Sequence, residues 1–347
     1  MFNAKKIVSL VMSAIISSTM VTAIPANAKY YKNRCAGFKV VKNFTAYNRE
    51  FSISEGIAGD SSYIYVAKID STKNYAAIKR VNPNNKNEDA TLMKFTNSNV
   101  AGDLKHANDM FILKENGVRY LYVNNGEGDI IKLQIDDNQK TLKKVKRIKV
   151  YKENKSNKKV KLKFSGLAGF EDELYDKSEY RIILKAGKQI FTANIHKNNT
   201  NEEVTAIKKF NLDTNVMMPT SKNNAKEVNY DFSSSSFASQ GIAYYNGDLY
   251  VTYSMASGNK VENKSFIVIY KNLYSKLNNS GTSTEAKPDN DAKFYFESDK
   301  FKLRYEIEGC AIVNNKIYFN VDRKSDDNSD KDHNNKDAVL EVLDYRP

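Results

Sequence analysis

The sequence predicts an all-β fold, namely a five-bladed β-propeller in which each blade has four antiparallel strands. Three observations support this prediction. A short phrase that begins with a polar and a small residue occurs five times, and each copy precedes an aromatic segment that is typical of a β-strand. The copies recur at roughly 50 to 75 residues, the spacing of a repeated supersecondary unit with loop insertions. The last repeat lacks one strand, and an alternating segment near the N-terminus can supply it.

The repeated phrase marks the start of the innermost strand of each predicted blade. Its five copies are Glu55-Gly56-Ile57-Ala58, His106-Ala107-Asn108-Asp109, Ser165-Gly166-Leu167-Ala168, Gln240-Gly241-Ile242-Ala243 and Glu308-Gly309-Cys310-Ala311. A small residue at the second position lets the strands crowd around one axis, where a larger side chain would clash. We therefore expect the polar residues that open the phrase to lie around one mouth of a central channel.

Each repeat divides into short segments of alternating apolar and polar residues, separated by turns rich in Asn, Gly, Asp and Lys. The first two repeats predict strands at residues 56–59, 63–69, 76–81, 91–96, 107–113, 119–124, 130–135 and 142–150. The next two predict strands at residues 166–170, 180–185, 189–195, 204–211, 241–245, 248–254, 266–270 and 292–297. The fifth repeat supplies residues 309–313, 316–323 and 338–343.

An unassigned alternating segment, Phe38 to Phe44, can complete the fifth sheet. A ring that is closed by a strand from the other end of the chain leaves only short, protected sheet edges. We therefore expect a single propeller domain over residues 29–347. A β-sandwich or a stacked solenoid is the alternative, and neither explains a last repeat that lacks one strand.

Residues 1–28 have the pattern of a secretory signal peptide. Lys5 and Lys6 precede an apolar stretch, and Pro25-Ala26-Asn27-Ala28 supplies a cleavage site of small residues. The mature chain then begins at Lys29 and is secreted. An uncleaved membrane anchor is the alternative, but the stretch is diluted by Ser and Thr. No later segment is apolar enough to predict a transmembrane segment in the mature chain.

Cys35 and Cys310 are the two cysteines, and export permits a disulfide between them. In the predicted propeller they lie near the outermost and the innermost strand of one sheet, farther apart than the roughly 7 Å between Cα atoms that a disulfide can span. Whether they are bridged stays open.

The chain has a formal net charge of +13, and lysines concentrate between Lys140 and Lys163. On a secreted protein such a charge favours anionic partners, for example envelope polymers or lipid headgroups. The same pattern is typical of a solvated edge strand, on which lysines prevent aggregation. None of the signatures of nucleic-acid-binding modules occurs, so nucleic acid is the least expected partner.

The candidate ligand-binding site consists of the polar residues that open the phrase, namely Glu55, His106, Ser165, Gln240 and Glu308. Convergent polar groups at the mouth of a channel are a common place for recognition. The alternative is that these groups bind only each other and water. His106, Glu55 and Glu308 could also coordinate a cation. The sequence contains no established metal-ligand spacing, so we predict no metal and no cofactor.

Asp109 occupies the fourth position of the phrase, where the other copies have Ala. It is therefore the strongest single candidate for a catalytic or ligand-binding acid. Together with Glu308 it could form the pair of carboxylates that hydrolysis of a glycosidic bond requires. The alternative is a buried acid that caps a turn. The sequence contains no nucleophile elbow, P-loop or dinucleotide-binding motif.

The last two repeats contain the most regular motifs, which are Ser239-Gln240-Gly241-Ile242-Ala243 with Gly247-Asp248-Leu249-Tyr250-Val251-Thr252, and Glu306-Ile307-Glu308-Gly309-Cys310-Ala311 with Lys316-Ile317-Tyr318-Phe319 and Val339-Leu340-Glu341-Val342-Leu343. These motifs resemble the helveticin J family of large secreted bacteriocins. The resemblance covers mainly the last third of the chain. It implies a propeller-type protein that binds or acts on the envelope of competing cells.

The sequence as a whole predicts a secreted propeller that binds a glycan or an anionic polymer of the bacterial cell envelope, without catalysis and with a bacteriocin-like role. The alternative is a five-bladed glycoside hydrolase that uses Asp109 and Glu308. A surface-adhesion module that attaches through the lysine-rich region, and so detaches at high salt, is the third interpretation.

Overall fold

The computed structural model describes residues 37–44, 51, 53–70, 72, 74–85, 87–170, 178–221, 224–255, 264–278, 285–290, 292–297, 304–324 and 337–343. These residues belong to one compact unit. They form four sheets of four strands, one sheet of seven strands and one hairpin of two strands. The predicted signal peptide and Cys35 lie outside the described residues. Among the described residues, no helix has the length and hydrophobicity that crossing a bilayer requires.

The four-stranded sheets are antiparallel throughout, and in each the strands follow one another from the inner edge outward. The first contains β2 (Ile53–Gly59), β3 (Ile64–Ile69), β4 (Ala76–Val81) and β5 (Thr91–Leu92). Another contains β12 (Gly166–Phe170), β13 (Glu179–Ala186), β14 (Gln189–His196) and β16 (Ile207–Asn211). The next contains β19 (Phe237–Tyr245), β20 (Asp248–Met255), β21 (Lys264–Tyr270) and β22 (Lys293–Glu297). The last contains β23 (Arg304–Val313), β24 (Lys316–Lys324), β25 (Ala338–Val342) and β1 (Phe38–Asn43).

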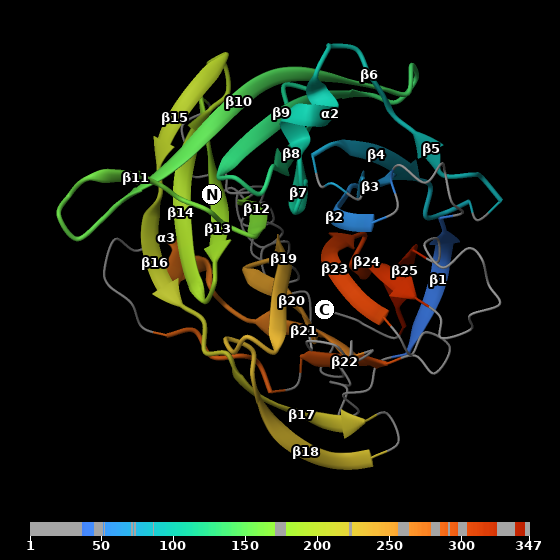
Figure 1. The fold of residues 1–347 in the computed structure, drawn as a ribbon, viewed down its shortest axis with the longest axis vertical. Helices are drawn as coiled ribbons and strands as arrows, with labels where there is room; N and C mark the ends of the chain where they lie inside the picture. Colours follow the sequence, from blue (N-terminus) through green and yellow to red (C-terminus); the bar gives the residue numbers. More distant parts are fainter. Residues whose placement is uncertain are drawn as a thin grey trace, which may run out of the picture. The chain divides into compact units, whose positions relative to one another are not determined.

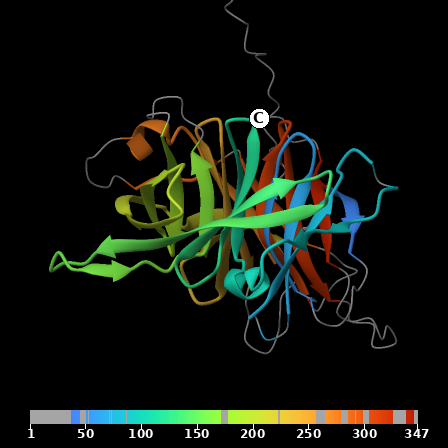
Figure 2. The same ribbon diagram turned by 90° about the horizontal axis from the view of Figure 1, so that it is seen from above.

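The second repeat forms part of the seven-stranded sheet. Its main path is β7 (Asp109–Glu115), β8 (Val118–Asn124), β9 (Asp129–Asp136), β10 (Thr141–Glu153) and β11 (Lys159–Lys161). Two strands from the neighbouring repeats, β6 (Lys94–Phe95) and β15 (Asn201–Thr205), pair with β10 in parallel. Both partners lie along the edge of β10 opposite β9, and its 13 residues accommodate β6 at Thr141 and Leu142 and β15 at Arg147 to Tyr151. In Figure 2 the green hairpin of β10 and β11 projects away from the other sheets.

The predicted all-β class and the propeller-like arrangement are confirmed. Figure 1 shows β2, β7, β12, β19 and β23 around a common centre, and each contacts the next in this order, with β23 contacting β2. The prediction of five blades with four antiparallel strands each is wrong, because four sheets have four strands and the second repeat lies in the larger sheet. The predicted strands at residues 91–96 and 204–211 are each divided in two, since one part of each pairs with β10.

The predicted closure of the last sheet by the N-terminal strand is confirmed. β1 pairs antiparallel with β25, and Phe38 lies opposite Val342. The ring of Phe38 lies 5.7 Å from that of Tyr305, between centroids, so the strand is also held by aromatic packing. The two ends of the described chain therefore meet in one sheet.

Hydrophobic clusters fill the spaces between successive sheets around the axis. The cluster that closes the ring joins Val41 and Val339 of the last sheet to Ile57 and Val66 of the first. Each cluster requires the sheets on both of its sides. The hydrophobic effect therefore favours the closed ring over separate sheets.

Besides β11, three elements have no counterpart among the predicted strands. They are the hairpin of β17 (Asn215–Ser221) and β18 (Asn224–Asp231) and the short helices α2 (Val100–Leu104) and α3 (Tyr274–Asn278). Val216 and Met218 of the hairpin are buried in the cluster beside β20 and β21. Phe232, which follows β18, stacks on Tyr253 with 4.4 Å between ring centroids.

Asp109 lies at the start of β7 and is fully buried on the axis. Its Oδ2 atom accepts the backbone N–H of Leu167 in β12 (2.7 Å) and that of Ile242 in β19 (2.8 Å). Its Oδ1 atom accepts the N–H of Met110 (2.9 Å). A single carboxylate thus joins three inner strands.

The small residues of the phrase allow the inner strands to meet at this level of the axis, as predicted. A Cβ atom on Gly241 would lie 2.8 Å from Asp109 Oδ1 and 3.1 Å from the Cα atom of Gly309. A Cβ atom on Gly56 would lie 2.8 Å from the carbonyl oxygen of Ala107. These distances are below ordinary van der Waals contact, so the strands pack directly against one another at this level.

We expect Gly241→Ala to lower the free energy of unfolding by about 1 to 3 kcal/mol. The added methyl group would clash with the Asp109 carboxylate and the Gly309 backbone, both of which are held in place by the packed strands. Chemical denaturation monitored by circular dichroism measures this change. The matched control is Gly102→Ala in α2, where the new Cβ atom would lie at an ordinary 3.5 Å from the Tyr75 ring. Equal stability of the two variants would contradict the close approach at the axis.

Candidate functional site

The repeated phrase forms a β-bulge in three inner strands. The register shifts at Glu55 in β2, at Gln240 in β19 and at Glu308 in β23. A bulge interrupts the alternation of a strand and redirects the side chain at that position. The sequence pattern of a polar residue followed by glycine therefore corresponds to a local change of backbone geometry.

Buried polar side chains on the second strand of each repeat face these inner strands, and they are Lys68, Asn124, Lys185, Thr252 and Asn320. The Thr252 hydroxyl donates to the carbonyl of Gly241 at 3.0 Å. The Asn320 side-chain amide donates to the carbonyl of Glu55 in the neighbouring sheet. Such bonds satisfy carbonyl groups that the bulges leave without a ladder partner.

Glu55 and His106 form the first contact between predicted site residues. His106 Nδ1 lies 3.4 Å from Glu55 Oε2, and the Glu55 side chain is 8% exposed. The turn that carries His106 is strained, because Lys105 and Ala107 have positive φ angles of 46° and 45°. The carbonyl of Ala107 accepts the N–H of Gly56 at 3.0 Å, which fixes this turn against β2.

Three carboxylates gather beside this pair. One oxygen each of Glu306, Glu308 and Asp322 lies within 4.8 Å of the others. The amide of Gln240 donates to Glu306 Oε1 at 2.8 Å. Glu306 and Asp322 are direct partners in the register of β23 and β24, so two like charges face each other across adjacent strands.

Lys68 supplies a cation next to these acids. It is 3% exposed, and its ammonium group forms an ion pair with Asp337 and lies 3.4 Å from the Ser54 hydroxyl. Burial lowers the pKa of Lys68 to about 7, while the charges of Asp322 and Glu308 act in the opposite direction. The acids and this ammonium group form one largely buried cluster, in which Glu308 and Asp322 are 5% and 8% exposed. We call Glu55, Glu306, Glu308, Asp322 and Lys68 the acidic mouth.

Four of the six predicted site residues take part in these contacts. Glu55 lies beside His106, and Gln240 donates to Glu306, which is grouped with Glu308. Ser165 is joined to neighbouring strands through its backbone, since its N–H donates to Lys185 at 3.0 Å and its carbonyl accepts from Asn124 at 3.3 Å. Among the described contacts it meets none of the other predicted site residues.

Asp109 lies in the packed centre of the ring and contacts none of the other predicted site residues among the described contacts. Burial raises the pKa of Asp109 to about 8, although the three backbone N–H donors and the Lys185 ammonium group oppose this shift. Burial also lowers the pKa of Lys185 to about 8. The environment of Asp109 is that of a structural acid.

Glu306, Asp322 and Lys68 complete the acidic mouth, and the sequence pattern alone does not identify them. One signal is present in the sequence, because Asn320 and Asp322 interrupt an otherwise apolar and aromatic strand. Their grouping with Glu308 depends on the register of β23 and β24, which the sequence pattern does not define.

Three carboxylates at this spacing match the oxygen ligands that a hard cation such as Ca²⁺ prefers. Within the described residues, His106 is not part of that group. Cys310 is a free, buried cysteine on β23, and burial raises the pKa of its thiol.

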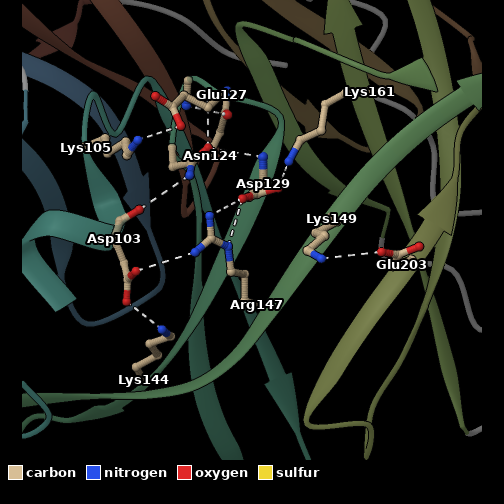
Figure 3. A network of polar contacts seen from close by, with 12 residues as sticks. Asp103, Lys105, Asn124, Glu127, Asp129, Lys144, Arg147, Lys149, Lys161 and Glu203 are labelled. Carbon is tan, nitrogen blue, oxygen red and sulfur yellow. Dashed lines mark hydrogen bonds and ion pairs between the residues drawn. The ribbon is translucent and has the colours of Figure 1, made fainter. Parts of the chain in front are cut away.

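The lysine-rich region of β10 and β11 is largely paired with acids from neighbouring strands. Figure 3 shows Asp129 between Arg147, at 2.5 Å, and Lys161. Further pairs in this region are Lys144 with Asp103, and Lys149 and Lys159 with Glu203. These acids offset much of the local positive charge, which favours the solvated edge over a patch for anionic polymers.

No family model and no curated protein matches this sequence. Several solved structures are similar to it. They include an α-L-arabinofuranosidase from Podospora anserina in complex with cellotriose, at a TM-score of 0.42 and 8% identity over 89% of this chain and 97% of that chain. A GH62 hydrolase in complex with xylotriose has a TM-score of 0.47 and 7% identity over 90% and 98% of the two chains. A glycosyl hydrolase from Bacteroides ovatus has a TM-score of 0.45 and 11% identity over 90% and 95%.

Proposed function

We propose that this protein acts on glycans and hydrolyses glycosidic bonds at the acidic mouth. The observation that supports this most directly is the grouping of Glu306, Glu308 and Asp322, whose oxygens lie within 4.8 Å of one another. Retaining glycosidases place two carboxyl groups roughly 5 Å apart, whereas inverting enzymes separate them by roughly 6.5 to 9.5 Å to admit a water molecule. The spacing favours retention.

Glu308 and Asp322 are the proposed catalytic pair. The buried Lys68 side chain, whose pKa the charges of Asp322 and Glu308 raise against the effect of burial, is the cation of this group. Asp322 attacks the anomeric carbon while Glu308 protonates the departing glycosidic oxygen. Glu308 then removes a proton from the water that releases the glycosyl group from Asp322.

In this proposal Asp322 replaces Asp109 as the partner of Glu308. The carboxylate of Asp109 has no exposed surface and accepts three backbone N–H groups, so a sugar cannot reach it without disrupting the inner strands. The second strand of the last repeat, rather than the phrase itself, then carries one of the two catalytic acids.

Glycan binding without cleavage is the second candidate. The Glu55 contact with His106 and the Gln240 bond to Glu306 favour it, because carboxylate, imidazole and amide groups all bind sugar hydroxyls. The excess of carboxylates favours a neutral glycan over an anionic polymer, since like charges repel. In both candidates the ligand approaches the same end of the inner strands.

Secretion is also part of the proposal, and the N-terminal pattern of the sequence supports it. If residues 1–28 are removed on export, the protein recovered from the culture medium begins at Lys29. The intact mass of that protein is then expected to equal that of the chain from Lys29 onward. A mass that includes Lys5 and Lys6 would contradict cleavage. An antibacterial action, as the resemblance to the helveticin J family implies, stays a prediction that growth-inhibition assays test.

We expect Glu308→Gln to lower kcat/KM for a cleaved polysaccharide by about 10²- to 10⁴-fold, because the amide cannot transfer the proton. Release of reducing sugars from a panel of neutral polysaccharides measures this. The control is Glu203→Gln, which removes an exposed carboxylate of surface ion pairs. If the wild type binds members of the panel but releases no sugar, the hydrolase proposal fails in favour of binding alone.

We expect Asp109→Asn to destabilise the fold by about 1 to 3 kcal/mol without a specific loss of catalysis, because an amide cannot accept all three N–H groups. The melting temperature and the activity at a temperature well below it distinguish the two effects. An unchanged melting temperature together with lost activity would return Asp109 to the catalytic site.

A further inference from the structure

A cavity of about 550 Å³ lies at the opposite end of the axis from the acidic mouth, where the inner strands end. It is lined by residues of β2, β7, β12, β19 and β23 and by turns that follow them. In β2, β12, β19 and β23 the glycine of the phrase lies between the mouth position and the residues that line the cavity. We call this space the axial cavity.

The floor of the axial cavity is formed by the fourth position of the repeated phrase. Ala58, Ala168, Ala243 and Ala311 all line it. Their short side chains leave the volume open, and the buried Cys310 thiol, a weak hydrogen-bonding group, lies beside them. The alanine side chains and the thiol offer few hydrogen-bonding groups, so this part of the lining suits an apolar ring, while Ser61, Ser62 and Asn314 supply polar groups elsewhere in the lining.

Two aromatic rings of the wall are held in place by rings behind them. Phe111 stacks on Tyr122 with 4.7 Å between centroids and 6° between planes, and Tyr244 stacks on Phe170 with 5.0 Å and 19°. Gly169 makes room for this arrangement, because a Cβ atom there would lie 2.6 Å from the Phe111 ring. The wall is thus fixed before a ligand binds, which reduces the entropy lost on binding.

The rim of the axial cavity carries a positive charge that no described acid offsets. Arg119 donates to Asp60 at 2.5 Å and forms an ion pair with Asp137, so its charge is balanced. Lys114 is exposed and, among the described residues, makes no hydrogen bond or ion pair. A ligand with an anionic group at one end fits this distribution of charge.

We infer that the axial cavity binds a small aromatic carboxylate, with its ring on the alanine floor between Phe111 and Tyr244 and its carboxylate near Lys114. The volume lies within the roughly 300 to 1,000 Å³ that small-molecule sites occupy. This site is separate from the acidic mouth and does not depend on the function proposed for that end.

The test uses 2-naphthoate and the full-length mature protein in isothermal titration calorimetry at low salt. We expect saturable binding at one site. Ala243→Leu and Ala311→Leu fill the floor and should weaken binding by at least about tenfold, whereas Ala101→Leu in α2, outside the cavity, should leave it unchanged. Melting temperatures establish that each variant is folded.

The role of the charge is tested with 2-naphthalenemethanol, which has the same ring system without a carboxylate. Lys114→Ala should weaken naphthoate binding about two- to fivefold and leave the alcohol unaffected, and Lys114→Arg should retain binding. Glu308→Gln should change neither, because it lies in the acidic mouth. Absence of naphthoate binding to the folded wild type, or unchanged binding by Ala243→Leu, would overturn the inference.

Discussion

One buried carboxylate holds the centre of this molecule together. Asp109 accepts N–H groups from Leu167 and Ile242, and so fixes β7, β12 and β19 to one another at the axis. An apolar residue there would leave these N–H groups buried without partners, at about 1 to 3 kcal/mol for each. The register corrects the alignment predicted from the phrase: Asp109 lies opposite Asn124 as Gly309 lies opposite Asn320, so Asp109 is at the level of the glycines. Phe111, opposite Tyr122, takes the place that Ala311, opposite Tyr318, has in its strand. The hydrophobic clusters between the sheets and the pairing of β1 with β25 then close the ring around this centre.

The repeated phrase defines three levels along the axis. Its first position supplies Glu55, Gln240 and Glu308 at bulges. Glu308 is one of the grouped carboxylates, and Gln240 donates to another, Glu306. Its second position is small, so that the strands meet at Gly241. Its fourth position leaves the axial cavity open. An acidic end and an end with an alanine floor therefore arise from one short pattern, and the packed level lies between them. Pairing within the lysine-rich region makes that surface a weaker candidate for recognition.

The sequence predicts those features that depend on local alternation and repetition. These include the inner strands, the closing strand near Phe38 and the small residues at the axis. It does not predict pairing between repeats, and so it misses the parallel partners of β10 that enlarge one sheet. It also misses Asp322, because only the register of β23 and β24 brings this residue beside Glu308. It aligns Asp109 with the alanines, whereas the register places this residue at the level of the glycines, and its role follows from contacts with strands far away in the sequence.

Hydrogen exchange at the backbone amides of Leu167 and Ile242 tests the central claim most directly, because both N–H groups donate to Asp109 rather than to a strand partner. Amides in a buried core exchange only when the fold opens globally, whereas amides of exposed turns exchange through local motion. The account predicts that both amides exchange as slowly as those of the central strands. It also predicts that Asp109→Ala speeds exchange at these two amides more than at other amides of the core. Exchange in the wild type as fast as at the exposed turn residue Gly117 would contradict it.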